Sequence, residues 1–194
     1  MRLNNISNVI EFPSPEAAIE TIVKNTEAAI IANTALNWGT LPKKVYFIYD
    51  TPKQVVKTLQ ELTNSTGPYK NMKYPLVILF EDIKQSLRQG MNGLTSSFKA
   101  RIVICTLTDP NYRAPQRDIE NFNPILIPIA QELLRQFSLS KVFSMPGVND
   151  MGTESLEMYK RYSWGSVEVD KNILNDYIDA IEFPGISLNL KTIC

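Results

Sequence analysis

The stretch YPLVILFED, residues 74–82, and the stretch FKARIVICTLTD, residues 98–109, decide the fold of this chain. Both are short apolar runs rich in β-branched residues and bounded by polar or turn-forming residues, which is typical of strands inside a sheet. We expect them to pair as antiparallel neighbours, because they follow each other along the chain. Their connection, residues 83–97, is far longer than a tight turn, and we expect it to project as a long β-hairpin loop.

Two further predicted strands complete the sheet. A β-rich run covers residues near 44–49. Residues near 186–192 alternate Ile186, Leu188 and Leu190 with polar neighbours, which predicts a strand with one buried face. The pattern predicts an α/β chain of the α+β type, in which helices flank a mainly antiparallel central sheet. We expect a single domain over residues 1–194.

Four helices are expected around this sheet. Ser14 is a natural N-cap with Pro15 at the first helical position, and Thr51-Pro52 starts a second helix in the same way. A third helix runs through residues 124–137, where two prolines should disturb the first turns. Apolar residues recur at helical spacing from Ile173 to Ile181, which predicts a fourth helix with polar residues on its opposite side.

The composition is that of an ordered globular chain. The 194 residues are 44% hydrophobic and 21% charged, with a formal net charge of zero, which argues against bulk electrostatic binding to nucleic acid or an anionic membrane. No run of about 18 apolar residues occurs, and the N-terminus lacks the apolar core of a secretory signal. Two cysteines imply no disulfide framework. We expect a soluble protein made in the cytoplasm.

Histidine is absent from the sequence. Ser-His-Asp and Cys-His nucleophilic systems, histidine general bases and His-based zinc sites are therefore excluded. The eight glycines are scattered, and they form neither a phosphate-binding loop nor a dinucleotide fingerprint. The sequence predicts a protein that is not an enzyme and that uses no cofactor and no metal.

A group of carboxylates toward the C-terminus invites a metal interpretation. Asp176 and Asp179 are three residues apart on the expected helix, close enough to touch one Mg²⁺. Further acids lie nearby in the sequence, namely Glu168, Asp170 and Glu182. The favoured interpretation is simpler: the acids form the solvated face of the helix, opposite its apolar stripe.

The segment FEDIK, residues 80–84, suggests a second chemical alternative. Metal-dependent nucleases often place an acidic residue, a spacer and a Lys at the end of a central strand. Glu81, Asp82 and Lys84 fit this order, so a metal-dependent DNA nuclease that uses them is the alternative function. We favour the interpretation that these charges mark where a strand leaves the core.

Neither the internal cysteine nor the clustered aromatic residues indicate a catalytic or nucleic-acid-binding site. Cys105 lies inside an apolar run and is expected to be a buried, inert thiol. Tyr159, Tyr162 and Trp164 could stack on bases beside Lys160. Positions in the core or in a subunit interface are the favoured interpretation for these aromatic side chains.

The connection of residues 83–97 has the composition of a contact surface. Its apolar residues lie among basic and amide side chains, a pattern that can bury apolar anchors inside a polar rim. Residues 168–182 have the opposite sign, with five acids against one Lys. We therefore expect contacts between copies of the chain. The candidate subunit-interface residues are Lys84, Leu87, Arg88, Met91, Leu94, Asp176 and Asp179.

The order of motifs over residues 74 to about 192 resembles a group of phage proteins. The motifs are YPLVILFED, ARIVICTLTDPNYRAPQRDIENFNPILIPIAQELLRQF, YSWG and NILNDYIDAIEFPGISLNLK. Together they resemble small virion proteins of phages and prophages of Bacteroidota, including crAss-like phages. Many proteins of that group carry a His before the YSWG-like motif, whereas this chain has none. The resemblance implies no catalytic residue.

The resemblance implies a neck or tail-completion protein, similar in layout to the tail-terminator proteins of long-tailed phages. Such α/β proteins form homo-oligomeric rings, here of roughly six or twelve copies, around the DNA channel. The expected partners are other copies, the portal and the adjacent neck or tail proteins. DNA would pass through an acidic lumen without sequence-specific binding, and no membrane would be involved. The expected location is the virion; on the alternative, the protein is a phage DNA-processing nuclease.

Overall fold

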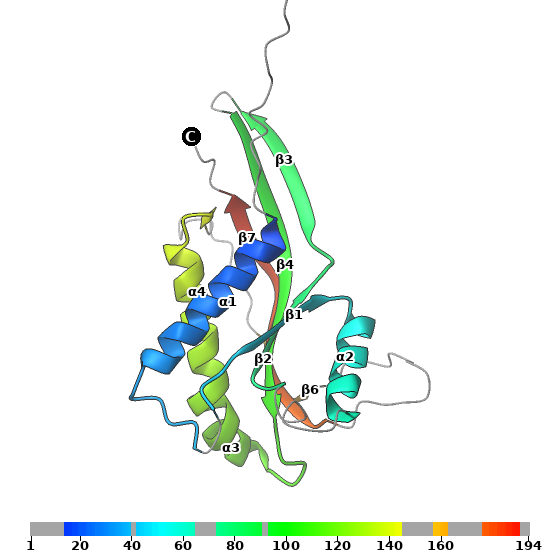
Figure 1. Ribbon diagram of the computed structural model, residues 1–194, viewed down its shortest axis with the longest axis vertical. Coiled ribbons are helices and arrows are strands. Elements are labelled where there is room, and N and C mark those ends of the chain that lie inside the picture. The colour runs from blue at the N-terminus through cyan, green and yellow to red at the C-terminus, as the bar shows by residue number, and fades with distance from the viewer. Residues whose placement is uncertain are drawn as a thin grey trace, which may run out of the picture.

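A computed structural model describes residues 14–39, 42–64, 73–90, 93–144, 157–162 and 176–190. The elements follow the order α1 (Pro15–Ala32), β1 (Tyr46–Asp50), α2 (Pro52–Asn64), β2 (Leu76–Phe80), β3 (Lys84–Gly90), β4 (Gly93–Leu107), α3 (Ala114–Arg117), η2 (Asp118–Leu126), α4 (Ile127–Leu139), β5 (Phe143–Ser144), β6 (Glu157–Tyr162) and β7 (Ile178–Leu190). For residues 84–90 and 93–96 the structure describes the backbone and not the side chains. The chain folds as a sheet with helices on both faces (Figure 1).

The sheet is mixed, with one parallel and several antiparallel pairs. Its strand order is β1-β2-β4-β7-β5, and β3 and β6 pair with β4 and β7 respectively. β1 and β2 are parallel, and α2 forms the crossover between them. The other described pairs are antiparallel. The predicted α+β class, with a mainly antiparallel sheet between helices, is confirmed.

The two stretches that open the sequence argument pair as predicted. β2 and β4 are antiparallel, with Leu76 opposite Cys105 and Leu79 opposite Ile102. The expected β-hairpin loop over residues 83–97 is more regular than predicted in its described part, where residues 84–90 form β3 and pair with residues 93–99 of β4. β3 continues along the edge of β4 where β2 ends, so the ladder supplies partners for backbone groups that a loop would leave to solvent.

The predicted helix from Ile173 to Ile181 is also wrong in its described part. β7 begins at Ile178, and residues 163–175 lie outside the described residues. Ile178 and Ala180 pack in the core on the α2 side of the sheet, whereas Ile181 packs in the core on the α1 and α4 side. Because β7 is buried on both faces, its apolar residues do not alternate with polar ones, and their spacing imitates that of a helix.

A β-bulge divides the long pair formed by β4 and β7. Ala100 lies opposite Ile186, and Ile102 lies opposite Phe183, so β7 has one more residue than β4 between the two pairs. Pro184 is exposed in this interval, where its missing N–H removes no donor from the regular ladder. The extra residue lets Phe183 and Ile186 face the same layer of the core.

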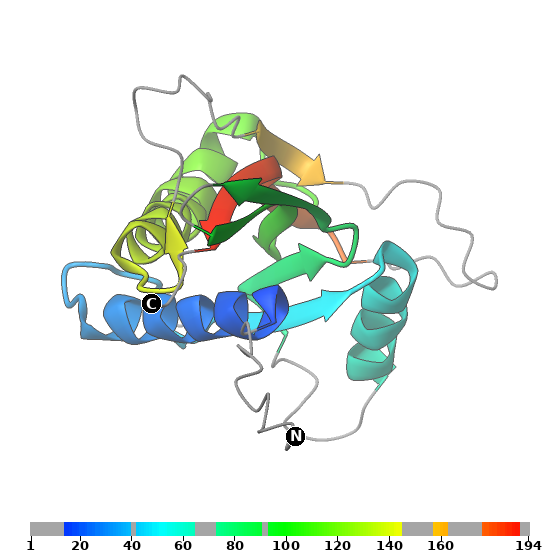
Figure 2. The same cartoon turned by 90° about the horizontal axis from the view of Figure 1, so that it is seen from above.

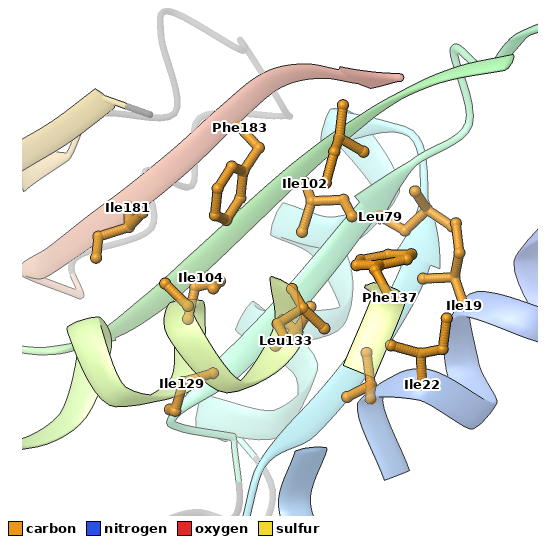
Figure 3. Packing of buried hydrophobic residues seen from close by; sticks show 14 of the residues in the cluster. Ile19, Ile22, Leu79, Ile102, Ile104, Ile129, Leu133, Phe137, Ile181 and Phe183 are labelled. Atoms are coloured by element: carbon orange, nitrogen blue, oxygen red, sulfur yellow. The ribbon is translucent and has the colours of Figure 1, made fainter. Parts of the chain in front are cut away.

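Two hydrophobic layers hold the helices to the sheet. Figure 2 shows α1 beside α4 on one face, with α2 standing apart from them. In the larger layer, Ile19 and Ile22 of α1 meet side chains of α4 and the central strands (Figure 3). Leu133 and Phe137 of α4 are fully buried there, and truncating either to Ala should cost about 2–5 kcal/mol. Val55 and Leu59 of α2 fill the smaller layer on the other face.

The first two helices start where the sequence predicts, whereas the helical stretch expected over residues 124–137 already begins at Ala114. The Ser14 side chain accepts a hydrogen bond from the Ala17 N–H at 3.3 Å, and the Thr51 hydroxyl accepts one from the Gln54 N–H at 3.2 Å. Pro124 lies inside the π-helical stretch η2, which runs directly into α4. A proline has no N–H for the regular helical ladder, so the wider turn is the local disturbance expected there. Among the described helices, none has the length and hydropathy needed to cross a bilayer.

Candidate functional site

The carboxylate of Asp179 lies in the protein interior. Its side chain is fully buried, and the Arg117 guanidinium donates to it at 2.7 Å. The Asn121 amide donates to its second oxygen at 2.7 Å. Asp179 was expected on the solvated face of a helix and among the subunit-interface residues; burial in β7 removes it from the surface. It serves instead to hold α3 and η2 against the sheet.

Arg117 joins three parts of the chain at this point. Besides Asp179, its guanidinium donates to the Thr108 hydroxyl and to the backbone carbonyls of Asp109 and Tyr112, each at 3.0 Å. These bonds fix the segment that leaves β4 and enters α3. The planar guanidinium satisfies several acceptors at once, a geometry that Lys does not provide.

Asp176 makes a second internal ion pair on the α2 side of the sheet. Lys73 donates to its carboxylate and to the Thr63 hydroxyl, each at 2.5 Å, and the Tyr74 hydroxyl donates to the same carboxylate at 3.1 Å. The Lys73 and Asp176 side chains are only 6% and 15% exposed. Asp176 was also expected as a surface interface residue, but its carboxylate is engaged by two side chains from the segment before β2.

Glu182 completes the set of paired acids. Arg101 of β4 donates to it at 2.5 Å, and the Arg101 guanidinium lies 4.6 Å from the centre of the Phe80 ring. Asp176, Asp179 and Glu182 thus each neutralise a cation inside the fold. These three acids therefore do not form the solvent-exposed acidic face predicted over residues 168–182. The other two acids of that range, Glu168 and Asp170, lie outside the described residues.

Alkaline pH should weaken the fold through two phenols, those of the buried Tyr74 and the half-buried Tyr162. Desolvation by burial raises the pKa of Tyr162 to about 12, and desolvation followed by the charges of Cys105 and Asp176 raises the pKa of Tyr74 still further. Both phenols ionise near pH 10 in the unfolded chain. Their contribution to stability is therefore complete below about pH 10 and is lost as the pH rises through the higher folded-state values.

Urea unfolding at several pH values between about 9 and 12 checks this expectation. We expect the free energy of unfolding to fall over that range, and the fall to be shallower in Tyr74→Phe. Tyr177→Phe, which changes a side chain 55% exposed, is the matched control. A Tyr74→Phe variant that loses stability with pH as steeply as the parent chain would show that this phenol does not govern the transition.

The sequence-predicted chemical residues do not form a catalytic cluster in the described part of the chain. Glu81 and Asp82 follow β2 and are exposed, and the Lys84 side chain lies outside the described part. Within the described residues, no group of three or more His, Cys, Asp and Glu is placed to hold a metal. Cys105 is fully buried, as predicted, and burial raises the pKa of its thiol.

The predicted aromatic cluster is partly described. Tyr159 and Tyr162 of β6 pack edge to face, with their ring centres 5.3 Å apart. Lys160 pairs with Asp118 at 2.6 Å and lies over the Phe122 ring, so it links β6 to η2. Trp164 lies outside the described residues. The contacts of these residues join β6 to the rest of the fold, and they leave base stacking a prediction without support.

A pocket that the sequence did not reveal lies at the end of β4, between the segment after α1 and η2. It has a volume of about 540 Å³, within the range of ligand sites. Its walls come from the segment after α1, the segment after β4, and η2. The lining residues are Asn37, Trp38, Gly39, Leu107, Thr108, Asp109, Tyr112, Ile119, Glu120, Asn121, Pro124 and Ile125.

Trp38 is the unusual residue of this pocket. Its side chain is 5% exposed, yet the indole N–H has no hydrogen-bond acceptor among the described residues. A buried donor without an acceptor costs free energy, so such a group calls for an explanation. Gly39 follows at a φ of +61°, a backbone conformation that favours glycine, and its N–H donates to the Asn37 side chain at 2.9 Å. The turn therefore holds Trp38 in place.

The rim of the pocket is apolar and acidic. Leu107 and Ile119 are 47% and 66% exposed. Asp109 and Glu120 are exposed carboxylates, and the lining contains no Lys or Arg. The pocket thus combines apolar walls with two negative charges. We take it as the candidate functional site; none of its residues was among the sequence-predicted site residues.

Comparisons with known proteins assign no family. No protein-family model matches the sequence, and no curated protein is significantly similar to it. The functional argument therefore depends on the residues and on the geometry described above.

Proposed function

We propose that the protein is a structural subunit of a homo-oligomeric ring in the neck or tail of a phage virion, where the ring joins the head side to the tail and surrounds the DNA channel. Two independent points support the proposal. The motif order of residues 74 to about 192 resembles virion proteins of this kind. The α+β layers, with helices on both faces of a mainly antiparallel sheet, match the layout that the resemblance implies.

The observation that carries the proposal is the strand pair of β3 and the first half of β4, which we call the arm (residues 84–99). The arm extends the sheet to the upper end of the molecule in Figure 1. Only β4 pairs with β3 among the described strands, so the outer edge of β3 presents backbone donors and acceptors to another chain. Its sequence adds Leu87, Met91 and Leu94 as apolar anchors.

Electron microscopy of the purified chain tests the proposal. We expect closed rings with an open centre, because heterologous contacts close when the rotation between copies allows it. A chain seen only as single particles of one copy would favour a monomeric adaptor instead. The nuclease alternative has its own test: Mg²⁺-dependent cleavage of plasmid DNA that disappears in Glu81→Ala would replace the structural role with an enzymatic one.

A further inference from the structure

The pocket beside α3 and the arm lie at opposite ends of the same strand. β4 runs from Gly93, at the tip of the arm, to Leu107, in the wall of the pocket. At roughly 3.4 Å per residue, its 15 residues separate the two features by about 50 Å. Figure 1 shows the arm at one end of the molecule and α3 at the other. A chain cannot therefore fill its own pocket with its own arm, whereas a second copy can.

The two features are chemically complementary. Residues 83–97 contain Lys84 and Arg88 and no acid, whereas the pocket lining contains Asp109 and Glu120 and no base. Besides Phe98 of the core, the arm carries Leu87, Met91 and Leu94, and the pocket exposes Leu107 and Ile119. Attraction between opposite charges with burial of apolar anchors is the usual composition of a specific interface.

We propose that the pocket formed by the segment after α1, the end of β4 and η2 receives the arm of a second copy, so that copies join head to tail. The inference deepens the proposed ring function and rests on it. Because the arm and the pocket are different surfaces, the contact is heterologous: each copy gives one arm and receives another, which leads to rings or filaments rather than to a two-fold dimer.

Cysteine cross-linking tests the contact in the full-length chain. In a Cys194→Ser background, Met91→Cys in the arm and Ile119→Cys in the pocket are made together in one chain. We expect mild oxidation to give a ladder of covalent multimers, because every copy inserts its arm into one neighbour and receives the arm of another in its pocket. The buried thiol of Cys105 stays unreactive in the folded chain. Met91→Cys combined with Leu139→Cys is the control, since Leu139 is 62% exposed against 66% for Ile119 but ends α4, away from the pocket.

Each outcome is decisive. A ladder with the pocket cysteine and none with the control supports the inference. Covalent products that stop at dimers overturn the head-to-tail arrangement. Assembly without cross-links to the pocket overturns this contact and leaves the proposed ring standing, with another surface as the receptor. A chain that is monomeric at all concentrations and gives no cross-links overturns both.

A charge placed in the pocket gives an independent measurement. Ile119→Asp adds a third acid opposite the basic arm and removes an apolar contact, so association should weaken by about tenfold or more in light scattering. Leu139→Asp is the matched control and should leave association unchanged. Equal effects of the two variants would show that the pocket has no special part in assembly.

Discussion

Replacing Arg117 by Ala should lower the free energy of unfolding by about 3–5 kcal/mol. The change leaves the carboxylate of Asp179 fully buried without its cation, with Asn121 as its remaining hydrogen-bond donor among the contacts described above. It also removes the bonds from the guanidinium to the segment between β4 and α3. Burying an unpaired charge is among the most costly changes that a single substitution can make.

Urea unfolding of the purified variant measures the effect. Arg135→Ala is the matched control, because Arg135 also pairs with an acid, at 2.6 Å, but is 54% exposed. An exposed pair of this kind contributes about 0–1 kcal/mol. The double change Arg117→Leu with Asp179→Leu should recover part of the loss, since it removes the buried charge as well. If Arg117→Ala costs no more than Arg135→Ala, the internal ion pair does not hold the fold together.

Replacing residues 87–96 by Asn-Gly should abolish assembly and leave the fold nearly intact. The new turn joins Ser86 to Ser97, which already face each other in the ladder. Hydrogen-bonded and non-hydrogen-bonded residue pairs alternate along an antiparallel ladder. The pair of Ser86 and Ser97 lies four pairs from that of Gly90 and Gly93, so both pairs are of the same kind, and a two-residue turn can close the hairpin at either. Phe98, which belongs to the core, stays in place. We expect a melting temperature within a few degrees of the parent chain and the loss of all multimers in light scattering.

A variant of unchanged length separates the effect of the apolar side chains of the arm from the effect of its length. Replacing Leu87, Met91 and Leu94 together by Ser should also block assembly, because the apolar anchors are lost while the backbone ladder remains. Gln85→Ser with Gln89→Ser is the control and should assemble normally. If the shortened chain still forms rings, the arm is only part of the surface, and the main structural support for the proposed function is lost.

The sequence predicted best where the signal is local. The Ser14 and Thr51 caps are set by residues within three positions of each helix start, and both are confirmed. The antiparallel pair of β2 and β4 followed from two apolar runs of strand length. The strand pairing within the arm was missed because its two strands are polar.

Prediction from the sequence failed for features that depend on contacts between segments far apart in the chain. Asp179 looked like part of a solvated face, since its partner Arg117 lies 62 positions away in the sequence. Burial on both sides made β7 resemble a helix. The pocket was invisible because Trp38, Leu107 and Ile119 come from three separate segments, and no local pattern marks an indole donor that will lack an acceptor. Tertiary packing decides these features, and spacing along the chain does not.

The native mass of the full-length chain tests the central claim most directly. The chain weighs 22.0 kDa, and native mass spectrometry resolves the number of copies in an assembly. A ring subunit predicts one dominant species of roughly six or twelve copies, which persists on dilution and disappears when residues 87–96 are replaced by Asn-Gly. A single species of 22.0 kDa at every concentration, unchanged by that replacement, would contradict the account.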